Sequence, residues 1–189
     1  GLIESGGSFY GTTTDGGAAQ QGTVFRMTPA GTVTLLYSFN GTDGSRPYGG
    51  VIEDGGVLYG TTGTGWGANA NGSVFKLDPN GGLTTLHTFN VTDGFYPHGR
   101  LLRTGGAFYG TTQWGGSHNK GTVFRIDPSG DFTSLHSFDG TDGSYPTGGL
   151  IERGGALFGT TREGGPFGRG TVFRMDSSGS VTSLHSFDD

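Results

Sequence analysis

The sequence of 189 residues contains no cysteine, which excludes disulfide bonds and thiolate metal sites. It has no cluster of basic residues, and its formal net charge of -5 disfavours contact with the phosphates of nucleic acids. No segment approaches the roughly 20 apolar residues that a membrane-spanning helix needs. Helical periodicity is absent as well, because glycines interrupt each segment before an amphipathic helix of ordinary length could form. These absences favour a chain of short β-strands.

Glycine, in contrast, is abundant, with 42 copies that recur at fixed places. Four times a Gly-Thr-Thr sequence follows a tyrosine or phenylalanine, and its glycines are Gly11, Gly60, Gly110 and Gly159. They are separated by 49, 50 and 49 residues. A constant period in this range is typical of propellers and other repeat architectures. The chain is therefore four copies of one structural unit.

The second copy indicates what each unit contains. Three segments rich in β-formers, 57–62, 73–77 and 83–89, follow a short apolar run at 50–53. The Asp-Pro-Asn-Gly sequence at 78–81 predicts a tight turn. Four short antiparallel strands in about 50 residues are typical of a propeller blade. We predict an all-β fold, a β-propeller with four four-stranded antiparallel blades in a single domain, residues 1–189, with blades at about 1–39, 50–89, 100–138 and 149–187.

The expected strand order assigns the loops to two faces. If the first strand of each blade is innermost, the loop between the second and third strands shares a face with the long connection between blades. The tight turns then lie on the opposite face. Loops on a rigid scaffold often carry function, so we expect the loop-rich face to be the working surface. The glycines inside the second strands are expected to let a ring from a neighbouring blade approach the backbone.

The terminal repeats resemble the internal ones, whereas terminal repeats of an array usually differ in order to cap it. Two arrangements remain. Four blades close as a small ring, or the chain is half of a larger ring that a second copy or residues outside this sequence complete. We favour the larger ring and expect self-association, because an open arc exposes apolar sheet faces. The chain begins at Gly1 rather than at methionine, so we expect a processed or truncated start.

Gly22-Thr23-Val24-Phe25-Arg26 and its three copies are the most specific sequences in the chain. Together with Gly-Leu-Ile, Gly-Gly, Tyr-Gly-Thr-Thr, Asp-Pro-x-Gly, Ser-Phe and Thr-Asp-Gly, they resemble the GloVer tandem repeat of Gloeobacter and Verrucomicrobia. The resemblance covers all four copies. It implies a bacterial surface or secreted protein, hence an extracellular or cell-surface location, and it assigns no catalytic residues. The order of these sequences is also similar to that of six-bladed NHL-type propellers, an analogy of fold only.

The expected loop-rich face holds aromatic rings, amides and a few cations. A flat ring packs on the C–H groups of a sugar while polar neighbours bond its hydroxyls. We therefore predict a site for carbohydrate or a partner protein among Trp66, Trp114, Tyr48, Tyr96, Tyr145, His98, His118, Asn69 and Arg46. The alternative is that these rings pack over loop glycines or between blades.

No metal or other cofactor is expected. The segments 40–44 and 139–143 look superficially like calcium loops, but they lack the terminal bidentate acid of an EF-hand. Asp and Asn also cap turns, so capping is the favoured interpretation and calcium the less favoured one. One slot on the fourth strand holds three histidines and Tyr37, and we expect these histidines to be structural and too far apart to share one ion. They are His87, His136 and His185.

Catalytic signatures are missing: no serine–histidine–acid motif, phosphate loop or dinucleotide fingerprint appears. Three innermost strands share a glutamate, replaced by Arg103 in the third copy, and we expect these charges to be structural or solvated. They are Glu4, Glu53 and Glu152. The leading prediction is a non-catalytic extracellular binding or structural-assembly module. The alternatives are a carbohydrate-active enzyme, a hydrolase or lyase that uses loop acids such as Asp15 or Glu163, and a filament-forming subunit.

Overall fold

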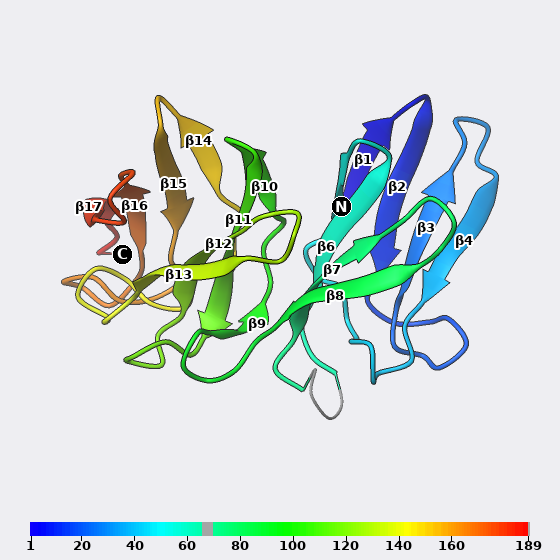
Figure 1. Ribbon diagram of the computed structural model, residues 1–189. Helices are drawn as coiled ribbons and strands as arrows, with labels where there is room; N and C mark the ends of the chain where they lie inside the picture. Colours follow the sequence, from blue (N-terminus) through cyan, green and yellow to red (C-terminus); the bar gives the residue numbers. More distant parts are fainter. Residues whose placement is uncertain (66–69, 189) are drawn as a thin grey trace. The chain divides into compact units, whose positions relative to one another are not determined.

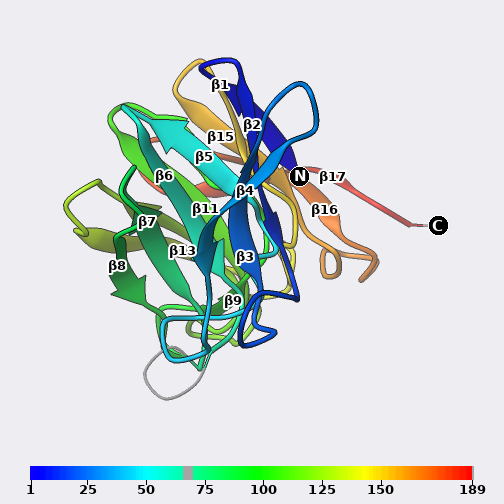
Figure 2. The same cartoon turned by 90° about the vertical axis from the view of Figure 1, so that its right-hand side faces the viewer.

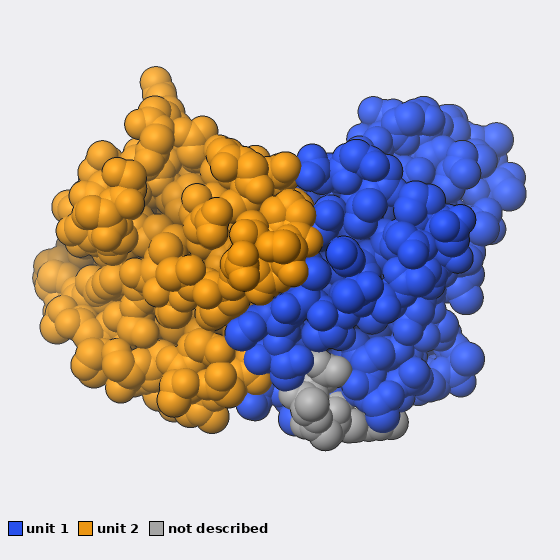
Figure 3. All heavy atoms as spheres, viewed as in Figure 1, with its two compact units in different colours: residues 1–88 blue, residues 89–189 orange. Residues whose placement is uncertain are grey.

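A computed structural model describes residues 1–65 and 70–188, and these contain strands and turns but no helix. The chain divides into two compact units, Gly1–Thr88 and Phe89–Asp189 (Figure 3). Each unit contains two antiparallel sheets built on four strands in chain order. The predicted all-β architecture of four four-stranded antiparallel sheets is therefore confirmed. No helix in the described ranges is long and apolar enough to cross a membrane.

The first unit consists of two four-stranded sheets (Figure 1). The strands of the first sheet are β1 (Leu2–Ser5), β2 (Ser8–Thr13), β3 (Thr23–Met27) and β4 (Val33–Ser38). Those of the second sheet are β5 (Val51–Asp54), β6 (Val57–Thr62), β7 (Ser73–Leu77) and β8 (Leu83–Thr88). The register shifts between the third and fourth strands of both sheets, at Val24/Phe25 and Val74/Phe75.

The second unit repeats this plan with one addition. The strands of the third sheet are β10 (Leu102–Thr104), β11 (Ala107–Trp114), β12 (Thr122–Ile126) and β13 (Phe132–Ser137). Those of the fourth sheet are β14 (Ile151–Arg153), β15 (Ala156–Thr160), β16 (Thr171–Met175) and β17 (Val181–Ser186). A further short strand, β9 (Phe95–Pro97), pairs with the end of β11, which the sequence did not predict.

The tight turns and the long loops lie at opposite ends of each unit. In the first unit the β1–β2 and β3–β4 turns are at one end and the β2–β3 loop is at the other (Figure 1). The view turned by 90° agrees (Figure 2). In the second unit the β10–β11 and β14–β15 turns are likewise opposite β9 (Figure 1). We call these ends the turn face and the loop face of each unit.

Phenylalanines join consecutive sheets within a unit. Phe39, just after β4, meets Phe75 of the second sheet edge-on, with ring centroids 5.3 Å apart. Phe138 meets Phe173 of the fourth sheet in the same way, at 5.2 Å. All four rings are fully buried. The Ser-Phe sequences that follow β4 and β13 are therefore anchors on which the next sheet of the same unit packs, and burying such a ring removes about 150–250 Å² from water.

Hydroxyl pairs explain why each copy repeats Gly-Thr-Thr and Gly-Thr/Ser-Val-Phe. The two sequences lie on neighbouring strands, and their side-chain oxygens are 2.8 to 2.9 Å apart in all four sheets. The pairs are Thr13–Thr23, Thr62–Ser73, Thr112–Thr122 and Thr161–Thr171. Thr171 Oγ1 also contacts the Asp142 carbonyl at 3.1 Å, and Gly143 adopts φ +133° against Thr161. The Thr-Asp-Gly sequence thus docks on the hydroxyl pair of the next sheet.

The glycines inside the second strands do accommodate rings, but the expectation that a neighbouring blade supplies the ring was wrong. Gly110 lies directly opposite Phe124 on β12 of its own sheet. A Cβ added to Gly110 would lie 2.5 Å from Phe124 Cζ. Opposite residues on adjacent strands are closer to each other than stacked sheets are, so the cross-strand ring occupies the space. The same relation holds for the pairs Gly11–Phe25, Gly60–Phe75 and Gly159–Phe173.

Candidate functional site

Three residues on the loop faces share an unusual backbone conformation. Arg46, Tyr96 and Tyr145 each precede a proline in a connection, and their φ angles are +53°, +63° and +56°. Side chains with a Cβ disfavour this left-handed region, where glycine is the usual residue. A chain rich in glycine nevertheless places arginine or tyrosine at this position each time. Such strain persists only where surrounding structure enforces it, and it is concentrated at functional sites.

Backbone hydrogen bonds hold Tyr145 between the loops of the third and fourth sheets. Its N–H donates to the Lys120 carbonyl at 2.7 Å, and its own carbonyl accepts from the Arg162 N–H at 3.3 Å. The preceding Ser144 exchanges backbone bonds of 2.7 and 3.1 Å with Glu163. The backbone of Tyr145 is therefore held by hydrogen bonds on both sides, which fixes the direction of its Cα–Cβ bond.

Tyr145 belongs to a cluster with Trp114 and Lys120. The centroids of the Trp114 and Tyr145 rings are 4.3 Å apart, with the planes inclined by 48°. Lys120 Nζ donates to the Tyr145 hydroxyl at 3.2 Å and lies 5.2 Å from its ring centroid. All three side chains are half-buried. We call Trp114, Tyr145 and Lys120 the aromatic cluster; the sequence did not indicate Lys120, which no motif marks.

A second pair of rings accompanies β9. Tyr96 and His98 are stacked with centroids 6.3 Å apart and planes inclined by 25°. Phe95 of the same strand pairs with Trp114 on β11, so both ring pairs lie at the loop end of the third sheet. Burial lowers the pKa of His98, which favours its neutral form near pH 7.

The remaining predicted residues do not join this cluster by any described contact. In the first unit, Arg46 is held as Tyr145 is, by the Gln21 carbonyl and the Gly63 N–H. The Tyr48 ring lies over Gly63, where an added Cβ would be 2.6 Å from the ring, so this ring packs over a loop glycine. His118 is exposed, with Nδ1 3.0 Å from the Ser117 hydroxyl. Two other predicted residues, Trp66 and Asn69, lie outside the described residues.

The Asn/Asp-rich connections cap their own turns. The carboxylate of Asp139 accepts from both the N–H and the hydroxyl of Thr141, at 2.7 and 2.6 Å. The Thr141 hydroxyl is the main cause that lowers the pKa of Asp139 to about 2. Asn40 makes the equivalent bonds to Thr42, at 2.9 and 2.6 Å. The predicted capping role is confirmed, and no cluster of three or more potential metal ligands occurs in the described part of the chain.

The slot that holds tyrosine or histidine on the fourth strands faces the aspartate of Thr-Asp-Gly. The Tyr37 hydroxyl donates to Asp43 at 2.6 Å, and His136 Nε2 lies 2.6 Å from Asp142. Burial, followed by the bond to Asp43, raises the pKa of Tyr37 to about 12. Tyrosine and histidine replace each other at this position because each places a polar atom next to the equivalent aspartate of its own repeat.

The glutamates that the first strands of three sheets share have structural partners. Glu4, Glu53 and Glu152 each accept from the N–H of the second glycine in the following Gly-Gly turn, at 3.0, 2.5 and 2.6 Å. Of the two loop acids considered for catalysis, Asp15 belongs to the first unit and Glu163 to the second. Glu163 lies 3.7 Å from Arg162, and both side chains are largely exposed.

Several solved structures are similar to this chain over nearly its whole length. A GH43 protein of the Bacteroides ovatus xyloglucan PUL has 15% identity and a TM-score of 0.55, covering 98% of this chain and 40% of its own. A puromycin-hydrolyzing peptidase of Mycobacterium tuberculosis has 15% identity and a TM-score of 0.58, covering 97% and 28%. An α-L-arabinofuranosidase of Clostridium thermocellum has 16% identity and a TM-score of 0.52, covering 100% and 72%. The chain thus spans well under half of the first two.

These similarities define the class: an all-β, propeller-like fold. Residues 1–189 match the family model described as the Gloeobacter/Verrucomicrobia repeat, and the chain belongs to that family. The resemblance inferred from the repeated sequences is therefore confirmed over the full length. No curated protein matches the sequence.

Proposed function

We propose that this chain is a non-catalytic, extracellular binding module that recognises carbohydrate on its loop face. The aromatic cluster of Trp114, Tyr145 and Lys120 carries the proposal. A sugar offers C–H groups to an indole or phenol ring and hydroxyls to nearby donors. The cluster supplies two rings and a cation within one small area. The GH43 and arabinofuranosidase names of the similar structures are compatible with a carbohydrate ligand, although their likeness concerns the fold.

The strained backbone supports a role for the side chain of Tyr145. Holding a residue other than glycine at φ +56° costs of the order of 1–3 kcal/mol. Glycine would relieve this strain, and glycines occupy most other left-handed positions of the chain. The tyrosine is therefore retained for what its ring contacts. Tyr96, at φ +63° beside His98, follows the same reasoning.

Binding is favoured over hydrolysis because the repeated glutamates already serve turn caps. Glu53 and Glu152 accept N–H groups of their own hairpins, and no described contact pairs either with a second catalytic acid. Glycoside hydrolysis requires two carboxyl groups in defined and different environments. The arrangement of acids therefore supports a module that holds a glycan without cleaving it.

A glycan array followed by titration calorimetry tests this function. We expect one saccharide class to bind, Trp114→Ala to weaken binding at least tenfold, and Lys120→Met to weaken it less. His118→Ala, on the same loop but exposed, is the matched control and should bind normally. Trp114→Phe separates loss of the ring from a folding defect. Absence of any saccharide ligand, or equal affinity of wild type and Trp114→Ala, would contradict the proposal.

We further propose that a second copy covers the terminal sheets, as expected for a larger ring. Phe187 is 41% exposed, whereas Phe39 and Phe138 at the equivalent position are 0% exposed. Leu2 is 53% exposed, and its equivalent Leu150 only 6%. Leu2 of the first sheet and Phe187 after the fourth sheet are thus exposed, although the equivalent residues of other repeats are buried. Light scattering should give a mass above the 19.5 kDa of one chain for the wild type, and a mass of 19.5 kDa for Phe187→Ser. A wild type with a mass of 19.5 kDa at every concentration would exclude this assembly.

A further inference from the structure

The turn face of each unit contains a cavity between its two sheets. The cavity of the first unit has a volume of about 410 Å³, and that of the second about 300 Å³. Small-molecule pockets in proteins have volumes of about 300–1,000 Å³, so both lie within or at the edge of that range. Neither cavity belongs to the loop face.

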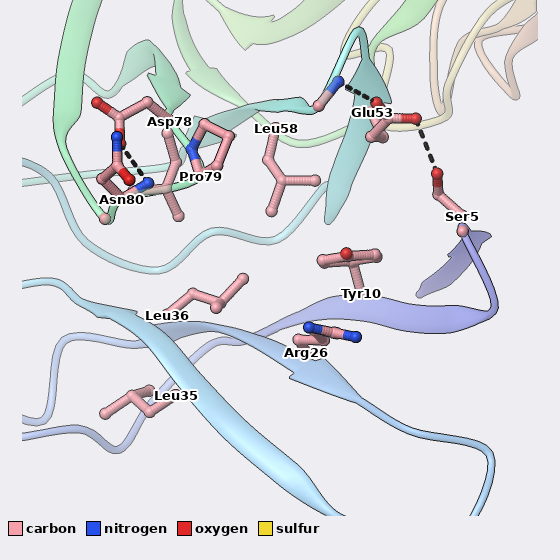
Figure 4. Close-up of a pocket in the computed structure, with 14 residues that line it drawn as sticks. Ser5, Tyr10, Arg26, Leu35, Leu36, Glu53, Leu58, Asp78, Pro79 and Asn80 are labelled. Carbon is pink, nitrogen blue, oxygen red and sulfur yellow. Dashed lines mark hydrogen bonds between the residues drawn. The ribbon is translucent and has the colours of Figure 1, made fainter.

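The first cavity combines apolar and polar side chains of both sheets (Figure 4). Leu36 of the first sheet and Leu58 of the second lie on facing sides, while Tyr10 and Arg26 come from β2 and β3. Glu53 of β5 lies on the opposite wall (Figure 4). The two sheets thus contribute different groups: the first a hydroxyl and a guanidinium, the second a carboxylate.

The second cavity is built from the same positions two repeats later. Every residue that lines it has a counterpart 98 or 99 positions earlier in the lining of the first. Nine of these pairs are identical in type. Three are glycines, and the other six are Tyr10–Tyr109, Arg26–Arg125, Leu36–Leu135, Glu53–Glu152, Leu58–Leu157 and Asp78–Asp176. The chain therefore carries one cavity design twice.

One position of the cavity lining alternates between phenylalanine and leucine along the four repeats. Leu58 and Leu157 occupy a position that is Phe9 in the first sheet and Phe108 in the third. In the third sheet Arg103 replaces the glutamate, and its guanidinium lies 5.1 Å from the Phe108 ring centroid. A sheet constrained only by the common repeat would carry the same residues in all four copies. Glutamate is also present in the first sheet, as Glu4, but only the second and fourth sheets combine it with the smaller leucine, and these pairs line the two cavities.

Both cavities have unused hydrogen-bonding groups. Arg26 uses Nε to bond Ser8 Oγ at 2.9 Å, and its terminal nitrogens contact no acceptor among the described residues. The hydroxyl groups of Tyr10 and Tyr109 likewise have no partner within residues 1–65 and 70–188. Glu53 is oriented by the Gly56 N–H at 2.5 Å and the Ser5 hydroxyl at 2.8 Å, which leaves further lone pairs for a ligand.

We propose that the two cavities are equivalent binding sites for a neutral monosaccharide unit, distinct from the loop-face site. The two leucines, one on each side, suit the C–H groups of a sugar ring. Tyr10 and Arg26 donate to its hydroxyls, and Glu53 accepts from them. Each lining contains two carboxylates and one guanidinium, so an anionic ligand is disfavoured.

A titration of the full chain with a panel of neutral methyl glycosides, followed by NMR amide shifts, tests this assignment, with glucuronic acid as the anionic comparison. We expect one of the neutral sugars to shift amides around Tyr10 and Tyr109, with two sites per chain, and glucuronic acid to bind at least tenfold more weakly. Leu58→Phe, which copies Phe9 and Phe108, should fill the first cavity and leave one site. Leu58→Phe combined with Leu157→Phe should leave none.

Two further variants keep the test independent of folding and of the loop face. Tyr10→Phe and Tyr109→Phe remove only a hydroxyl each, and we expect each to weaken binding at its own site at least fivefold. Trp114→Ala should leave both sites intact, so the loop-face proposal and this one can fail separately. The assignment is overturned if no sugar of the panel shifts these amides. It is also overturned if the variant that combines Leu58→Phe with Leu157→Phe is folded and still binds two sugars.

Discussion

Ser5 donates a 2.8 Å hydrogen bond to Glu53, which joins β1, the first strand of the first sheet, to β5, the first strand of the second. The same carboxylate also caps the β5–β6 turn through the Gly56 N–H. One glutamate therefore fixes both its own hairpin and the neighbouring sheet. These two hydrogen bonds orient the Glu53 carboxylate in the wall of the first cavity.

Replacing Ser5 by alanine tests this link. We expect Ser5→Ala to lower the free energy of unfolding by about 1 kcal/mol, because a partly buried bond to a carboxylate is lost while the cap at Gly56 remains. Urea denaturation measures the change. Ser180→Ala is the control, since its exposed hydroxyl makes no described bond, and it should stay within about 0.5 kcal/mol of wild type. Equal effects of the two substitutions would mean that the bond contributes nothing.

The cross-strand ring over Gly110 makes a second prediction. Gly110→Ala places a Cβ 2.5 Å from Phe124 Cζ and 3.1 Å from Leu101 Cδ2, so we expect a loss of about 1–3 kcal/mol from overpacking. Gly148→Ala is the matched control, because its nearest neighbour, Thr160 Oγ1, would be 3.4 Å away and its φ is not positive. That substitution should be neutral or slightly stabilising. Guanidinium denaturation measures the free energy of unfolding of both variants. An unchanged value for Gly110→Ala would show that the Phe124 ring moves aside without cost.

The buried hydroxyl pairs predict how the loops are held to the sheets. Thr112→Val keeps the shape of the side chain but removes its 2.8 Å bond to Thr122 Oγ1, which still donates to the Asp93 carbonyl. It also removes the bond to the Trp114 carbonyl, at 3.0 Å, and the acceptor of the Thr122 N–H, at 3.2 Å. We expect the free energy of unfolding to fall by about 1–3 kcal/mol, the usual effect when buried polar groups lose a hydrogen-bond partner. Thr133→Val, on the exposed side of β13, is the control and should change stability little. Thermal unfolding measures the stability of both variants. Equal stability of Thr112→Val and Thr133→Val would show that the hydroxyl pair does not stabilise the fold.

The repeat spacing was enough to predict the sheets, because turn residues and β-formers recur in a constant order. It did not reveal β9, since Pro97 lacks an N–H and argues against a strand, yet this residue pairs only at the end of β11. It also assigned the rings over Gly110 and its equivalents to the wrong sheet, because the register decides which residue lies opposite. Lys120 and the two cavities depend on how consecutive loops and sheets meet, which spacing along one chain does not specify.

Tyr37 gives the chain a predicted sensitivity to alkaline pH. Its pKa rises from 10.0 to about 12 on folding, chiefly through burial and then through the bond to Asp43. The folded state holds this proton more tightly, so the stabilising contribution is complete below pH 10 and is lost as the pH rises through about 12. We expect the free energy of unfolding to fall more steeply over this window in wild type than in Tyr37→Phe, which has no proton to lose there. Urea denaturation at stepped pH measures both slopes. Tyr37→Phe is less stable at pH 8 because the Asp43 bond is missing, so the slope and not the absolute value decides, and parallel curves from pH 10 to 12 would refute the coupling of Tyr37 to folding.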